Sequence, residues 1–165
     1  MKRALGAVTL LAAAVIQSTW AFHLEIGGAF PNLVLLAVVA ITWTEGVRPG
    51  LAAACVGGLL LDLTAPGAIG PHALALLACA YMTGFWPRNL EGHGFVYVAL
   101  SAALATVPYS LILLLAGALS HVPVPAPGDA AGLVLAAGVY NGVLAPVAFA
   151  IANRLRPQPG MVVTA

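Results

Sequence analysis

The charged residues of this chain are confined almost entirely to short breaks between apolar runs. Hydrophobic residues make up 62% of the 165 residues and charged residues only 7%, and the mean hydropathy is +1.03. A water-soluble domain of this composition would expose most of its apolar surface to water. Since a helix needs about 20 apolar residues to cross a bilayer, the length leaves room for five or six spans and short loops. The composition therefore predicts an integral membrane protein without a separate soluble domain.

Prolines, glycines and polar residues divide the chain into six predicted helices. The apolar runs cover residues 1–22, 31–44, 51–63, 72–86, 95–119 and 130–153. We predict one polytopic domain over residues 1–156 and a short cytoplasmic tail over 157–165. The first run could also be a secretory signal peptide, but an uncleaved first helix is the simpler interpretation.

The second and third runs are shorter than a full bilayer crossing. They either recruit flanking residues where the bilayer is thinned or form a re-entrant hairpin. A hairpin would bring Arg48 deep into the membrane, which is costly, so six spans are favoured. In that arrangement every basic residue falls on one side, namely Lys2, Arg3, Arg48, Arg88, Arg154 and Arg156. By the positive-inside rule both termini are then cytoplasmic.

Asp62 is the one ionisable residue inside an apolar run. A carboxylate within a membrane helix is a functional candidate by default, but this one falls near the outer end of its helix, where a helix-end cap is the alternative. A proton or sodium relay would need a second group at the same depth, and none is visible. The four histidines all lie in or beside loops and are expected to be solvated: His23, His72, His93 and His121.

Small residues recur at helical spacing in two places. Gly50, Ala54 and Gly58 form an i, i+4 stripe that continues to Asp62. The pair Gly138 and Gly142 has GxxxG spacing and encloses Asn141. Such seams allow helices to approach closely, and a polar residue beside them can add an interhelical hydrogen bond. Both a packing seam within the chain and a surface for another subunit fit this pattern.

Motifs of hydrolases, zinc proteases and phosphate-binding loops are absent from the sequence. The nearest enzymatic alternative is a membrane aspartyl protease that would use Asp62 and Asp129, but the Pro-rich surroundings of Asp129 do not match such a site. We therefore expect no catalysis, no metal and no cofactor, and nothing in the sequence indicates nucleic-acid binding.

Three blocks of the chain together resemble the MreD family of the bacterial rod-shape system, the elongasome. They are Phe30-Pro-Asn-Leu-Val-Leu-Leu, then Gly57-Gly-Leu-Leu-Leu-Asp-Leu with Gly70 and Ala73-Leu74, and finally Asn141-Gly-Val-Leu-Ala-Pro146 with Arg154. Their order, spacing and length agree with the family over about residues 30–156. One departure is Phe30, where the family often has a basic residue.

The resemblance implies an all-α bundle of six transmembrane helices, similar to the substrate-binding components of energy-coupling vitamin transporters. It implies a non-catalytic scaffold in the bacterial cytoplasmic (inner) membrane that binds MreC and supports peptidoglycan synthesis and cell shape. The wider complex would include MreB, RodA and a class B penicillin-binding transpeptidase, and self-association is possible.

On this interpretation the two small-residue seams are candidate contact surfaces for the helix of another subunit. Asn32, Asp62 and Asn141 are polar residues that fix loops or helix pairs in place. The alternative function is a substrate-binding subunit of a vitamin transporter with the same fold.

Overall fold

The computed structural model describes residues 2–20, 25, 28–65, 67–85 and 94–155. These residues form six helices and no strand. The helices are α1 (Lys2–Trp20), α2 (Leu33–Glu45), α3 (Val47–Thr64), α4 (Pro71–Thr83), α5 (Gly94–Leu119) and α6 (Pro127–Leu155). Three of them, α3, α5 and α6, are long and apolar enough to cross a membrane. The predicted all-helical class is therefore confirmed, and these three helices have the length and apolarity that a membrane span needs.

Several helix starts differ from the sequence prediction. Helix α2 begins at Leu33 and not at Pro31, because Asn32 is its N-cap and accepts a hydrogen bond from the Leu35 N–H at 2.9 Å. Helix α3 begins at Val47 instead of residue 51, so Arg48 lies in its first turn and not in a loop. Helix α6 begins at Pro127 instead of residue 130, since proline is well accommodated at the first helical position.

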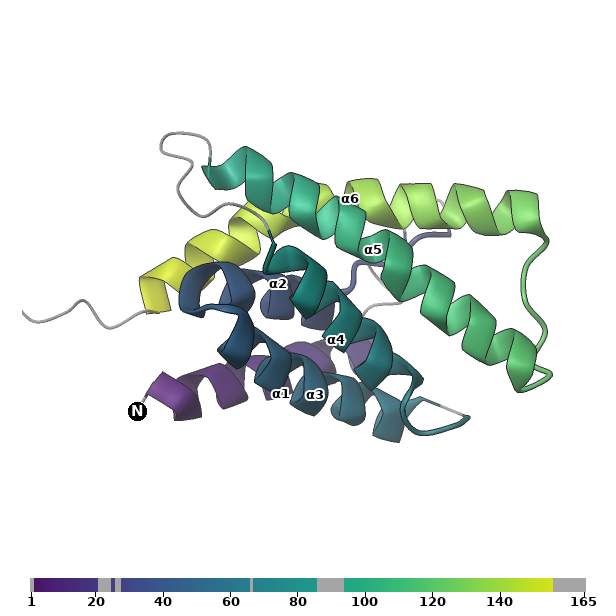
Figure 1. Ribbon diagram of the computed structural model, residues 1–165, viewed down its shortest axis with the longest axis horizontal. Coiled ribbons are helices and arrows are strands. Elements are labelled where there is room, and N and C mark those ends of the chain that lie inside the picture. The colour runs from purple at the N-terminus through teal and green to yellow at the C-terminus, as the bar shows by residue number, and fades with distance from the viewer. Residues whose placement is uncertain (1, 21–24, 26–27, 66, 86–93, 156–165) are drawn as a thin grey trace, which may run out of the picture.

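Helix α2 forms the centre of the bundle. It packs against each of the other five helices, and α1, α3, α4, α5 and α6 follow one another around it (Figure 1). Its sequence is apolar on nearly every face, which is typical of a helix surrounded by others. The fully buried core includes its own Val34, Leu35, Val38 and Val39 with Leu76 of α4 and Val98 of α5.

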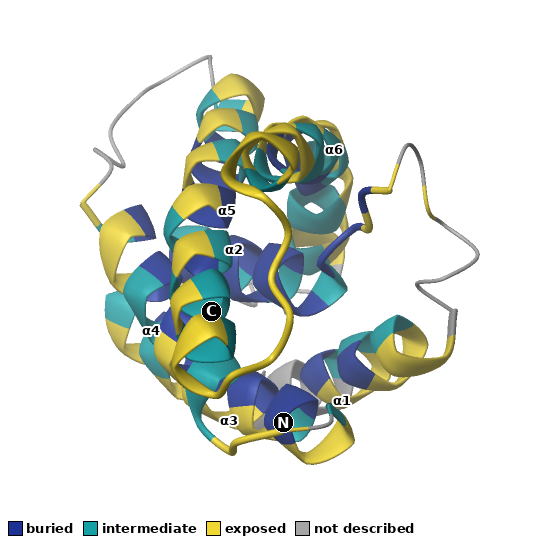
Figure 2. Cartoon of the chain, turned by 90° about the vertical axis from the view of Figure 1, so that its right-hand side faces the viewer, coloured by how far each residue is buried: buried dark blue, intermediate teal, exposed yellow. Residues whose placement is uncertain are grey.

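The outer surface of the bundle is largely apolar as well. Exposed large hydrophobic side chains follow α5 at Leu104, Leu111 and Leu115 and α6 at Val139 and Val143. Figure 2 shows exposed positions along the outward faces of these helices. A surface of this kind is stable only against hydrocarbon, as expected for helices in a bilayer.

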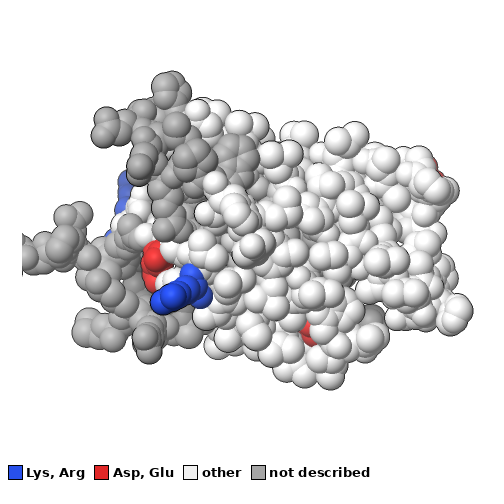
Figure 3. Space-filling model, viewed as in Figure 1, with Lys and Arg blue, Asp and Glu red and all other residues white. Residues whose placement is uncertain are grey.

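Charged side chains mark the ends of the bundle. Arg48 lies in the first turn of α3 and Arg154 in the last turn of α6, and both of these helix ends lie on the left in Figure 1. To the right of this end, Figure 3 shows a wide, mostly white surface with no Lys or Arg and only small patches of Asp or Glu. We call the end with Arg48 and Arg154 the basic end and the opposite one the far end.

Candidate functional site

A chain of buried polar side chains runs through the far half of the bundle. Four helices and the residue before α2 contribute to it. Its members are Asn32 before α2, Asp62 on α3, His72 on α4, Thr106 and Tyr109 on α5, and Asn141 on α6. Because unsatisfied polar groups are costly in an apolar interior, each of these side chains calls for a partner.

Asp62 caps the first turn of the next helix, α4. One carboxylate oxygen accepts the backbone N–H of His72 at 3.0 Å, and the other accepts that of Ala73 at 3.2 Å. The usual N-cap position is Gly70, which has no side chain, and Pro71 has no N–H to satisfy. Asp62 thus replaces the missing cap and brings a negative charge to the positive end of the helix dipole. The side chain of Asp62 is fully buried.

The position of Asp62 depends on a close approach between α3 and α4. A Cβ atom at Gly58 would overlap the backbone of Ala73, so only glycine allows these helices to pack at this distance. The connection between them contains Gly67 and Gly70, whose φ angles of 130° and 122° few other residues adopt. These glycines allow the chain to reverse within a few residues and return the start of α4 to Asp62.

His72 pairs with Asp62 and is not simply solvated, which corrects the sequence prediction. Its Nδ1 atom lies 2.8 Å from a carboxylate oxygen of Asp62, and 24% of its side chain is exposed. The His72 ring also lies beside Tyr109 of α5, with 6.2 Å between the ring centroids. The expectation that no group shares the depth of Asp62 is therefore wrong. The pair was not found in the sequence because ten residues and a loop separate its members.

Asn32 and Asn141 join the start of α2 to α5 and α6. The backbone N–H of Asn32 donates to the side-chain oxygen of Asn141 at 2.9 Å. The Asn141 amide donates to the hydroxyl of Thr106 at 3.0 Å, and that hydroxyl donates to the Ala102 carbonyl. The Tyr109 hydroxyl of α5 lies near the Asn32 side chain. Asn141 is only 1% exposed, so these bonds form out of contact with solvent.

The chain of polar residues satisfies the beginnings of two short helices. Helices α2 and α4 have 13 residues each, which corresponds to about 20 Å and is less than the roughly 30 Å of a hydrocarbon core. Their first N–H groups therefore need partners from the protein itself. Asp62 supplies them for α4, while for α2 Asn32 and Gln17 of α1 do so, the latter accepting from the Val34 N–H at 3.0 Å.

The predicted small-residue seams face helices of the same chain. A side chain at Gly50 would overlap Thr42 of α2, and Ala54 is fully buried. A Cβ atom at Gly142 would lie 3.2 Å from the Cβ of Ala103 on α5, and one at Gly138 would lie 3.4 Å from the Ala103 carbonyl oxygen. A helix of another protein would have to displace α2, α4 or α5 to reach these positions.

The hydrogen bonds of the polar chain hold the helices of the bundle in place. Within the described residues, Thr83 has the only buried side-chain oxygen or nitrogen without a partner, and no three His, Cys, Asp or Glu side chains come together as a possible metal site. Asp129 lies in the first turn of α6 and takes no part in the hydrogen bonds of Asp62. The carboxylate of Asp62 is engaged by three donors, which leaves it poorly placed as an acid or base.

Some sequence predictions fall outside the described residues. These are the roles of His23, Arg88, His93 and Arg156, the side chains of Lys2 and Arg3, and the tail over residues 157–165. Conversely, Thr106 and Tyr109 of the polar chain, and Gln17, which accepts from the Val34 N–H, were not singled out in the sequence. Each lies within a helical apolar run, where its polarity was the only available signal.

Comparisons with known proteins give no relative for this chain: no family model, no curated protein and no solved structure matches it.

Proposed function

We propose that the chain is a non-catalytic membrane scaffold of the MreD type, which binds MreC and supports peptidoglycan synthesis during cell elongation. One observation carries this proposal. The three sequence blocks that resemble MreD contribute Asn32, Asp62 and Asn141, and in the structure all three residues form buried hydrogen bonds at the starts of α2 and α4. Blocks that lie far apart in the sequence therefore serve one structural purpose, which is to satisfy the starts of the two short helices. This is expected if a family keeps these blocks because its fold requires them.

The proposal includes six spans with both termini in the cytoplasm of a bacterium. It is supported by the position of Arg48 and Arg154 at one end of the bundle (Figure 3), which the positive-inside rule assigns to the cytoplasmic face. The short helices α2 and α4 are accommodated because their starts are capped inside the protein. The far end, with Asp129 in the first turn of α6, then faces the periplasm.

The partner helix is expected on a face that the chain itself leaves uncovered. Of the three long helices, α6 buries the smallest share of its most apolar window, 22%. A row of apolar side chains spaced by four residues follows its outward face, namely Leu135, Val139, Val143, Val147 and Ile151. In a bilayer, such a face binds another helix through dispersion contacts and shape and not through the hydrophobic effect.

The first test is purification of the full-length chain from native bacterial membranes, followed by identification of the proteins that co-elute. Recovery of MreC in stoichiometric amount supports the scaffold. Recovery of an ATPase module or a tightly bound water-soluble vitamin in place of MreC would overturn the proposal and favour the transporter alternative.

The second test concerns the α6 face. Val143→Trp adds a bulky ring to a side chain that is 68% exposed, and it should lower MreC recovery about tenfold if the partner packs there. The control is Leu104→Trp on α5, whose side chain is 53% exposed. Equal recovery with both variants would exclude this face while leaving the scaffold function to the first test.

A further inference from the structure

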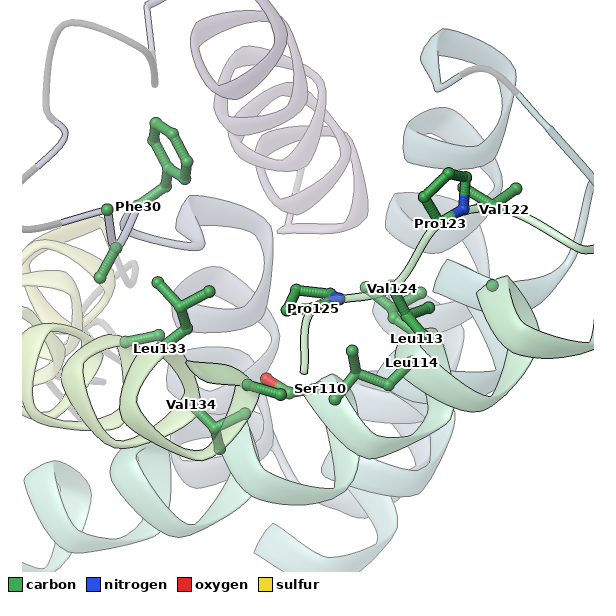
Figure 4. A pocket seen from close by; sticks show the side chains of 15 residues that line it. Phe30, Ser110, Leu113, Leu114, Val122, Pro123, Val124, Pro125, Leu133 and Val134 are labelled. Carbon is green, nitrogen blue, oxygen red and sulfur yellow. The ribbon is translucent and has the colours of Figure 1, made fainter. Parts of the chain in front are cut away.

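An apolar hollow of about 410 Å³ lies between α5 and α6 in the far half of the bundle. Figure 4 shows Leu133 and Val134 of α6 on one side, Leu113 and Leu114 of α5 on the other, and Ser110 between them. Ser110 has the only polar side chain among the residues that line the hollow, and none of these residues is charged. The volume falls within the range of small-molecule sites, about 300–1,000 Å³.

The hollow is framed by a stiff connection between the two helices. We call residues 120–126 the strap. Its direction is set by a Schellman motif at the end of α5, in which His121 has a φ of 56° and the Val122 N–H donates to the Gly117 carbonyl at 3.0 Å. Pro123 and Pro125 then keep it extended, because proline restricts φ and cannot donate to a helix. The strap is exposed along its whole length (Figure 2).

The volume and lining of the hollow fit a slender apolar chain. Its walls are apolar side chains, most of them from α5, α6 and the strap, with one hydroxyl and no charge among them. A hydrocarbon chain matches both the volume and the apolar lining.

We propose that this hollow holds one acyl chain of a membrane phospholipid, which keeps the far halves of α5 and α6 apart. Exposed Leu111, Leu115 and Leu135 lie on the same stretches of α5 and α6, so the hollow adjoins helix faces that hydrocarbon would cover. An empty apolar hollow forfeits dispersion contacts on every wall, and the neighbouring lipid is the medium at hand to restore them. Since no charged side chain lines the site, the acyl chain and not the head group is what the protein recognises. This site does not depend on MreC.

Delipidated full-length protein in detergent, titrated with dioleoyl phosphatidylglycerol and followed by native mass spectrometry, tests the proposal. Ala137→Phe fills the hollow from α6, whereas the matched Ala131→Phe adds the same ring at an exposed position of that helix. We expect one retained phospholipid for wild type and Ala131→Phe, and at least about tenfold lower occupancy for Ala137→Phe. The phospholipid should raise the unfolding temperature in the same two proteins only. Equal retention by all three proteins would overturn the proposal.

A measurement on the wild-type chain does not rely on a variant that folds. Phosphatidylglycerol with a diazirine at the end of one acyl chain is incorporated with the protein into nanodiscs and activated by light. Adducts concentrated on residues 110–117 and 130–137 support the site. Adducts spread evenly over the outward faces of α5 and α6 would overturn it. So would purification of the protein from native membranes with an isoprenoid or a peptide in the hollow in place of a phospholipid.

Discussion

Two neighbouring helix pairs, α3–α4 and α5–α6, differ in how closely their helices pack next to the connection between them. Helices α3 and α4 remain close up to their connection, where glycines allow a tight reversal and Asp62 caps α4. Helices α5 and α6 are close at Gly142, but they diverge toward the Pro-containing strap and enclose a hollow (Figures 1 and 4). Connection chemistry thus decides whether a helix pair closes on itself or leaves room for another molecule.

Glycine substitutions should produce the largest difference in stability between the two helix pairs. Gly58→Ala places a methyl group against the backbone of Ala73, which cannot move aside, and should lower the unfolding free energy by about 3 kcal/mol or more. The control is Gly132→Ala on α6, which meets nothing within 4 Å and should be neutral or stabilise by about 0.5–1 kcal/mol. Denaturation in detergent, followed by circular dichroism, measures both. Similar losses would show that the α3–α4 contact is not close.

Loss of the link between α2 and α6 should have the next largest effect. Asn141→Leu leaves the buried N–H of Asn32 without an acceptor and the Thr106 hydroxyl without a donor, at a cost of about 2 kcal/mol. Asn153→Leu, at an exposed position on the same helix, should change stability by less than about 0.5 kcal/mol. The same unfolding assay applies, and an unchanged midpoint for Asn141→Leu would contradict the role assigned to Asn141.

The cap on α4 should contribute less than the Asn141 link, since an amide can still accept one of the backbone hydrogen bonds. Asp62→Asn removes the charge and turns one acceptor into a donor facing an N–H group, which should cost about 1–2 kcal/mol. Asp129→Asn, in the exposed first turn of α6, should cost about 0.3–1 kcal/mol through the helix dipole alone. If the two variants lose equal stability, Asp62 acts only through the dipole.

The smallest expected effect concerns the strap. His121→Gly relieves a non-glycine residue in the left-handed region and should stabilise the chain by up to about 1 kcal/mol. Ser120→Gly, one residue earlier and outside that region, should destabilise slightly because glycine gains more freedom on unfolding. Thermal unfolding of the pair distinguishes them, and a loss of stability with His121→Gly would argue against the Schellman motif at the end of α5.

The sequence by itself determined the helical class, the number of helices among the described residues and the approximate position of each. Long uncharged apolar runs have few stable alternatives to helices in a membrane, because each segment must satisfy its own backbone groups. The single acid within a run and the glycine spacing also identified Asp62, Gly58 and Asn141 as positions of interest.

Only the tertiary structure decided what those residues contact. The Asp62–His72 pair and the bond between Asn32 and Asn141 join residues that are 10 and 109 positions apart in the chain, and no local pattern carries such pairing. The hollow likewise depends on the angle at which α5 and α6 separate. Local propensity determines where a helix begins and ends, whereas the partner of a buried polar group is decided by packing of the whole bundle.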